Sequence, residues 1–138
     1  MTILEGLDEA QAELLRSAGR MICCGRGVHV IRRGSDSRSV YTILSGEVEI
    51  RDRGTVVAKL GKGEVFGEMN FFLGEERTAD VISVDEDTAV VCYDERDLRK
   101  LALRDSDLAI RLLSNIARIL CTRLRALQQK TQGAAVHD

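Results

Sequence analysis

Two spacings of apolar and polar positions, together with helix start and stop signals near the N-terminus, divide the chain into three parts. Near the N-terminus, Asp8 followed by Gln11 resembles a helix capping box, and Gly19 follows as a helix stop. After this segment, runs such as EVEI and DVISV alternate polar and apolar residues, as half-buried strands do. Towards the C-terminus, apolar residues recur every three or four positions, as along a helix. The pattern predicts a helix over about 8–18, a β-rich segment over about 21–93 and helices over about 94–130.

The predicted strands are short, rich in β-branched residues and separated by glycines, and the chain contains no proline. Short strands at this spacing favour a small antiparallel barrel or roll over a parallel sheet, which would need crossover helices. We therefore expect an α+β fold: an antiparallel, jelly-roll-like β-roll with one helix before it and helices after it. The length is that of one domain, so residues 1–138 are expected to form a single unit.

In the C-terminal segment, Asp94 is a candidate N-cap for a first helix, and a second helical stretch begins with Ser106. The second helix carries an apolar stripe and several arginines. The stripe could cover the open face of the roll or pair with a second copy as a short coiled coil, and the arginines could meet an acidic partner. We expect packing first, homodimerisation second, and a solvated basic face for most arginines. The stripe comprises Leu113, Ala117, Leu120, Leu124 and Leu127, and the arginines are Arg111, Arg118, Arg123 and Arg125.

Charge and hydropathy exclude several classes of function. The formal net charge is only −2 and both signs are interspersed, so a global attraction to nucleic acid or to an acidic membrane is excluded. No apolar run approaches the roughly 20 residues needed to cross a bilayer. The N-terminus is acidic where a secretory signal is basic. The sequence predicts a cytoplasmic protein without a membrane partner.

Neither the cysteines nor the histidines have a spacing that would hold a metal ion. Two of the four cysteines are adjacent and the others are distant, so free thiols are expected. Two histidines are too few for a three-histidine centre. Without a metal-ligand cluster or a nucleophile–base pair, we expect no catalytic residue, no metal and no cofactor. These residues are Cys23, Cys24, Cys92, Cys121, His29 and His137.

The stretch FGEMNFFLGEERTADV, residues 66–81, can be interpreted in two ways. It is either a core segment pinned by an ion pair between Glu68 and Arg77, or a pocket for an anion. In the second interpretation, a helical turn near Glu68 presents unpaired N–H groups to a phosphate, and Arg77 donates two parallel N–H groups beside the Thr78 hydroxyl. A ribose hydroxyl would explain the carboxylate, because Glu68 can accept its hydrogen bond. The residues alone leave both interpretations open.

The same stretch resembles the phosphate-binding cassette of the cyclic nucleotide-binding domain family. This family includes regulatory domains of cyclic-nucleotide-dependent kinases and channels and of bacterial cyclic-AMP-responsive regulators. Its cassette reads F-G-E, an aliphatic, a small and two apolar residues, a variable stretch and R-[TSA]-A. The segment VIRRGSDSRSVYTILSGEVEI also matches without a gap, and the resemblance covers nearly the whole chain. The cassette matches are Phe66, Gly67, Glu68, Met69, Phe71, Phe72, Arg77, Thr78 and Ala79.

The resemblance implies a short cassette helix inside the roll and a role for each matched residue. Gly67, Glu68 and Met69 would begin that helix. Glu68 would hold the ribose 2′-hydroxyl, and Arg77 with Thr78 would hold the cyclic phosphate. The other residues assigned to the site are Asn70 and Ala79 in the cassette, Ile50, Val57 and Leu60 lining the roll interior, and Arg123 covering the base.

The cassette also departs from the family pattern. Asn70 stands where a small residue is usual, and Arg33 stands where the family often has an acidic residue. Glu75 and Glu76 precede the cassette arginine. This acidic pair could lower the affinity for an anionic ligand or compete for Arg77.

The resulting prediction is a non-catalytic sensor module that binds a cyclic nucleotide, cyclic AMP rather than cyclic GMP. It would signal to an unidentified effector protein through movement of its C-terminal helix. The alternative is a nucleotide-independent dimerisation or docking module that retains the fold. We expect no DNA-binding, kinase or channel segment in this chain, because the sequence ends after the helix.

Overall fold

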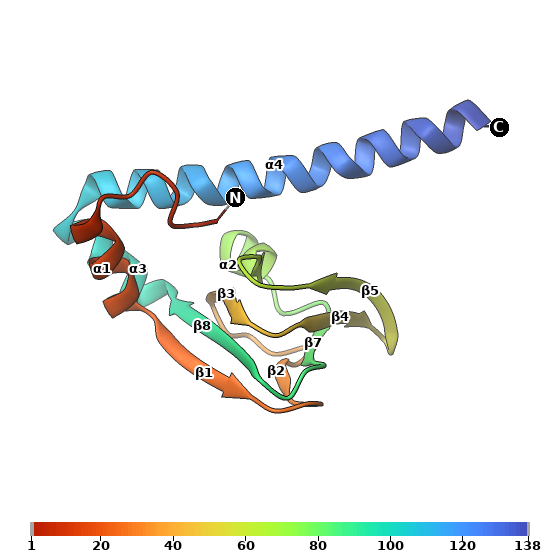
Figure 1. Cartoon of the computed structure of the whole chain (residues 1–138), viewed down its shortest axis with the longest axis horizontal. Helices are drawn as coiled ribbons and strands as arrows, with labels where there is room; N and C mark the ends of the chain where they lie inside the picture. Colours follow the sequence, from red (N-terminus) through yellow and green to blue (C-terminus); the bar gives the residue numbers. More distant parts are fainter. Residues whose placement is uncertain (1, 138) are drawn as a thin grey trace.

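The structure, a computed structural model, describes residues 2–137, with side chains up to Thr131. Helix α1 (Glu9–Ala18) precedes the strands, α2 (Glu68–Leu73) lies between β6 and β7, and α3 (Glu95–Arg104) and α4 (Ser106–His137) follow β8 (Figure 1). The strands are β1 (Arg20–Cys24), β2 (His29–Ile31), β3 (Ser39–Ser45), β4 (Val48–Asp52), β5 (Thr55–Leu60), β6 (Val65–Phe66), β7 (Asp80–Ser83) and β8 (Thr88–Asp94).

The strands form two four-stranded sheets, one in the order β1-β8-β3-β6 and the other in the order β2-β7-β4-β5. Every pairing between neighbours is antiparallel. The β4–β5 hairpin turns through Arg53 and Gly54, at φ 52° and 85°. Positive φ at two successive turn residues matches the right-handed twist of the flanking strands. The predicted α+β fold with an antiparallel roll is confirmed.

Side-chain caps set the starts of two helices. Asp8 and Gln11 form the predicted capping box at α1. Helix α4 begins at Ser106, as the sequence predicts. The preceding residue caps it, because the Asp105 carboxylate accepts from the backbone N–H of Leu108 at 3.0 Å.

The apolar side chains form two cores. One fills the roll between the two sheets, and the other lies between the roll and helices α1, α3 and α4. In Figure 1, α4 runs across one end of the roll, above α2, and extends beyond the strands. The roll core contains Ile31, Tyr41, Ile43, Val48, Leu60, Phe66, Val81, Val90 and Cys92, and the helical core contains Ile3, Leu15, Val40, Val65, Tyr93, Leu101, Leu108, Leu112, Ile116 and Ile119.

Helix α4 packs on the roll through a different face from the one expected. Its buried residues include Leu108, Leu112 and Ile116, whereas stripe residues such as Leu113 and Leu124 are 51% and 57% exposed. The expectation that the stripe packs first on the roll is therefore wrong. Helix α4 carries two apolar faces, and helical periodicity alone does not decide which of them meets the roll.

The described part of the structure also bears on the predictions about thiols, metal ions and membrane spans. The four cysteines are free thiols, with Cys23 and Cys121 exposed and Cys24 and Cys92 buried. Among the side chains described, those of residues 2–131, no group of three or more metal-ligating side chains comes together. Within residues 2–137, no helix has the length and hydropathy required to span a bilayer.

Candidate functional site

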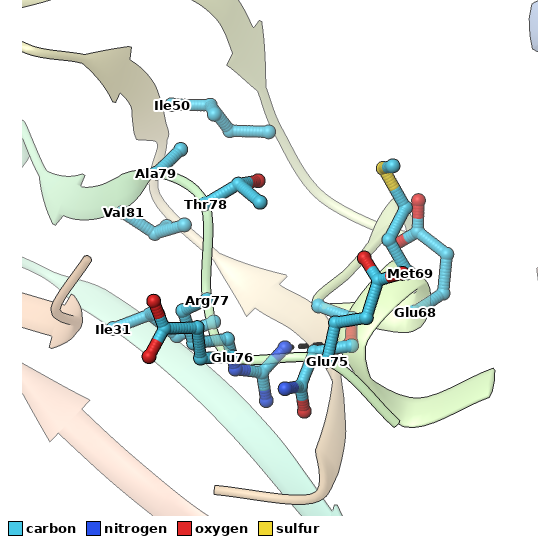
Figure 2. A pocket seen from close by; sticks show the side chains of 12 residues that line it. Ile31, Ile50, Glu68, Met69, Glu75, Glu76, Arg77, Thr78, Ala79 and Val81 are labelled. Carbon is cyan, nitrogen blue, oxygen red and sulfur yellow. Dashed lines mark hydrogen bonds between the residues drawn. The ribbon is translucent and has the colours of Figure 1, made fainter. Parts of the chain in front are cut away.

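A pocket of about 110 Å³ lies beside α2, between that helix, the loop leading into β7 and the inner face of the roll. Figure 2 shows Ile50, Ala79 and Val81 on the opposite side of the hollow from Glu68 and Met69. The apolar wall comes from three strands of one sheet, β2, β4 and β7. The lining residues are Ile31, Ile50, Gly67, Glu68, Met69, Asn70, Glu75, Glu76, Arg77, Thr78, Ala79 and Val81.

The fold brings most of the predicted site residues to this pocket. The seven assigned cassette residues and Ile50 line it, but Val57 and Leu60 do not. Val57 is 59% exposed, and Leu60 is buried in the roll core. Both belong to β5, the edge strand of its sheet, whose register sets which side chains face inward. Arg123 reaches the cassette from α4, as described below.

Gly67 places the start of α2 close to the neighbouring strand. Its φ of +82° favours glycine, and a Cβ atom there would lie 2.9 Å from Arg77 Nη1 and 3.2 Å from the Ser39 carbonyl oxygen. At the other end of α2, Gly74 is also left-handed, and its N–H donates to the Asn70 carbonyl. Two glycines therefore limit the cassette helix to six residues.

Arg77 is almost fully buried, at 5% exposure, beneath the start of α2. Its Nη1 donates to the Gly67 carbonyl and its Nη2 to the Ser39 carbonyl, both at 2.7 Å. The guanidinium carbon lies 6.0 Å from the centroid of the Tyr41 ring, within range of a cation–π contact. Burial lowers the pKa of Arg77, yet arginine keeps its charge in proteins. The pocket thus contains a fixed positive charge.

Glu68 pairs with the C-terminal helix. Its Oε1 lies 3.3 Å from Nη1 of Arg123, whose Nη2 also donates to the Val65 carbonyl. The Glu68 side chain is only 13% exposed. An ion pair between Glu68 and Arg77, one of the two interpretations of the sequence, does not occur among the described residues. Sequence spacing gave no signal for the Arg123 contact, because 55 residues separate its partners.

The acidic residues of the loop do not compete for Arg77. Glu75 and Glu76 are exposed, and within the described residues neither forms an ion pair with that guanidinium. Thr78 is also exposed and presents its hydroxyl at the pocket, as Figure 2 shows. The arginine is instead held by backbone carbonyls. Sequence reasoning missed the carbonyl of Ser39, because backbone acceptors carry no residue signature.

The pocket therefore combines a buried guanidinium, a shielded carboxylate and one hydroxyl with an apolar wall. The chain belongs to the cyclic nucleotide-binding domain family, since the family model "Cyclic nucleotide-binding domain" matches residues 24–105, more than half of the chain. The roll, the cassette helix and the flanking helices together form a regulatory domain of this class.

Comparison with individual proteins agrees with this assignment. The chain is 33% identical over 113 residues to the Pycsar effector protein XpPycTIR of Xanthomonas perforans, covering 81% of this chain and 37% of that protein. It is 28% identical over 128 residues to the cyclic AMP receptor protein of Thermus thermophilus, covering 89% of this chain and 57% of the receptor. The crystal structure of the Thermus thermophilus catabolite activator protein matches with a TM-score of 0.78 at 27% identity, over 94% of this chain and 61% of that one. The chain thus spans about a third to three fifths of these relatives.

Proposed function

We propose that the chain binds a 3′,5′-cyclic nucleotide in this pocket, cyclic AMP rather than cyclic GMP, as a cytoplasmic regulatory module without catalytic activity of its own. The observation that carries the proposal is that Arg77 and Glu68 line one pocket without pairing with each other in the described structure. A guanidinium matches a phosphate in charge and donor geometry, and a carboxylate accepts from a ribose hydroxyl. A ligand that carries both groups fits both side chains.

The preference for cyclic AMP is supported by the extent of one alignment. The match to the Thermus thermophilus cyclic AMP receptor protein extends over 128 residues, so it includes part of α4, which begins at Ser106. In our proposal α4 contributes Arg123 near the base. Thr78 favours neither base, because a hydroxyl residue there suits sensors of both nucleotides.

Calorimetric titration tests the proposal directly. The ligands are cyclic AMP, cyclic GMP, cyclic CMP and cyclic UMP, with 5′-AMP as a control that lacks the cyclic phosphate. We expect binding of cyclic AMP, weaker binding of cyclic GMP and none of 5′-AMP. In a thermal unfolding assay, ligand at a hundredfold excess over its dissociation constant should stabilise the fold by roughly 2.7 kcal/mol. Absence of binding by all four cyclic nucleotides would refute the proposed function.

The contacts of Arg123 support a mechanism in which a ligand bound in the pocket acts on the position of α4. It contacts Glu68 through Oε1, and a carboxylate has a second oxygen that can accept from a sugar hydroxyl. We propose that Glu68 holds the ribose and Arg123 together, so that the ligand favours the docked position of α4. An effector protein that prefers this position would then respond to the nucleotide.

The exposed stripe on α4 favours a second candidate function, dimerisation. Ile110, Leu113, Leu124 and Leu127 are all more than half exposed. With the exposed Ala117, and with Leu120, which also packs partly against the helical core, they alternate spacings of three and four residues, the pattern of a coiled-coil seam. We propose that two copies of the chain pair through this stripe. Pairing of this kind is compatible with nucleotide binding, because Arg123 projects towards the roll.

A further inference from the structure

Asn70 is a buried amide without a partner. It is 5% exposed, and neither its Nδ2 nor its Oδ1 has a hydrogen-bond partner among the described residues. Buried polar side chains are nearly always hydrogen-bonded, so each exception calls for a physical reason. Asn70 is the third residue of α2 and lines the cassette pocket. The residue that carries these unpaired atoms therefore lines the same pocket as Arg77.

Besides the two atoms of Asn70, a third buried atom without a hydrogen-bond partner belongs to Arg77, which lines the same pocket. Its Nη1 and Nη2 each donate to a carbonyl, but its buried Nε has no partner among the described residues. The carbonyl bound by Nη1 belongs to Gly67, three residues before Asn70 and therefore near the same face of the first helical turn. Two unsatisfied N–H donors, Nε of Arg77 and Nδ2 of Asn70, thus lie buried in residues that line one small pocket.

A space-filling role does not account for an amide at this position. An apolar side chain would fill the same volume without desolvating two polar atoms. The resemblance described above places a small residue at this position of the cassette, so the roll does not require a large side chain there. An acceptor supplied by a ligand would satisfy Nδ2, and the anionic oxygens of a phosphate are strong acceptors.

We propose that Asn70 is a ligand-binding residue, whose Nδ2 donates to an exocyclic oxygen of the cyclic phosphate beside Arg77. The inference rests on the proposed function, since it concerns the same pocket. Both unpaired donors are shielded from solvent in this structure, so the contact requires the Asn70 amide and the Arg77 guanidinium to shift towards the phosphate. The arginine N–H groups that remain free are then available to Asn70 Oδ1.

The first test compares Asn70→Ala with the unchanged chain, measuring cyclic AMP affinity by calorimetry and thermal stability without ligand. We expect the affinity to fall about tenfold or more, because a hydrogen bond to a charged group is lost. The melting temperature should stay the same or rise, since two unpaired buried atoms are removed. Equal or tighter binding by Asn70→Ala would overturn the inference, because it would show that the side chain only fills or obstructs the pocket.

A matched control is Asn115→Ala. Asn115 is another buried asparagine, but its Nδ2 donates to the carbonyls of Ile3 and Glu5 at 3.0 and 2.7 Å. Removing this amide should lower the melting temperature, opposite to the expectation for Asn70. If both variants lost stability equally, the Asn70 amide would have a structural partner and the inference would be wrong.

Phosphorothioate analogues identify the ligand atom. In the two diastereomers of cyclic AMP phosphorothioate, sulfur, a weak acceptor, replaces one or the other exocyclic oxygen. Asn70→Ala should weaken binding of one diastereomer much less than binding of cyclic AMP. Equal losses for cyclic AMP and both diastereomers would overturn the phosphate contact. Failure of the unchanged chain to bind any cyclic nucleotide would instead refute the proposed function, so the two failures can be told apart.

Discussion

Arg77 has one set of contacts in this structure and a second role in our proposal. Its guanidinium links the start of α2 to β3 through the carbonyls of Gly67 and Ser39. In the proposed complex it also neutralises a phosphate. A substitution at this position should therefore change both the free energy of unfolding and ligand affinity, and the two effects must be measured separately.

Replacing Arg77 by Ala should weaken cyclic AMP binding at least about 100-fold, equal to about 2.8 kcal/mol. Arg77→Lys should also bind weakly, because lysine keeps the charge but cannot offer two parallel donors. Calorimetry measures the affinities, and urea unfolding of each variant shows whether it is folded. Arg26→Ala, which removes an exposed arginine from the turn between β1 and β2, is the control. Unchanged affinity in both Arg77 variants would place the phosphate elsewhere.

Gly67 allows a separate test of the close packing above Arg77. Gly67→Ala combines a left-handed backbone with a Cβ atom 2.9 Å from Arg77 Nη1, whereas Gly27 has φ +83° and no atom within 4 Å of its Cβ position. Gly27→Ala should therefore cost only the backbone strain, about 1–2 kcal/mol. Gly67→Ala should lower the free energy of unfolding by more than this, as measured by urea denaturation. Equal losses would show that the contact with Arg77 adjusts without cost.

At the scale of elements, α4 connects the cassette to the rest of the molecule. Its N-terminal half holds the segment before α1, since Asn115 and Arg111 donate to the backbone carbonyls of Ile3, Glu5 and Gly6. Further along, Arg123 binds Glu68 and the Val65 carbonyl. The hydrogen bonds of Arg111 and Asn115 fix the N-terminal half of α4, and those of Arg123 connect the helix to the pocket. We infer that the helix beyond Ile119 is the part whose docking responds to the ligand.

Arg123→Ala tests this coupling. If ligand and docked helix favour each other, the loss of Arg123 should weaken cyclic AMP binding about fivefold or more, the usual range of a coupling free energy. Hydrogen exchange in the second half of α4 should also become faster. Arg118→Ala removes an exposed arginine from the same helix and should change neither quantity. Tighter binding by Arg123→Ala would show that Arg123 and the ribose compete for Glu68.

At the scale of the whole molecule, the exposed stripe on α4 lies on a helix that extends beyond the roll (Figure 1). A contiguous exposed apolar patch of this kind marks an interaction site. A second copy offers the same seam in the same register, as a symmetric pair of helices requires.

Leu124→Glu should convert the proposed dimer to a monomer, because it places a charge in the seam. Light scattering coupled to size-exclusion chromatography measures the mass. Leu103→Glu is the matched control, since Leu103 is 89% exposed on α3, away from the stripe. If the unchanged chain has the mass of a monomer at all concentrations, the dimer proposal is wrong, and ligand-dependent docking of α4 is the proposed output left to test.

Local patterns in the sequence were sufficient to predict much of the fold. The Asp8–Gln11 capping box, the alternating strands and the cassette between Phe66 and Ala79 each depend on residues close in sequence, where backbone geometry and side-chain type act directly. Packing contacts between distant residues decided the rest. They selected which of two apolar faces of α4 meets the roll, gave Glu68 the partner Arg123 rather than Arg77, and buried Asn70 without a partner. These outcomes depend on how helix and sheet surfaces fit together in three dimensions, which periodicity and motif spacing do not specify.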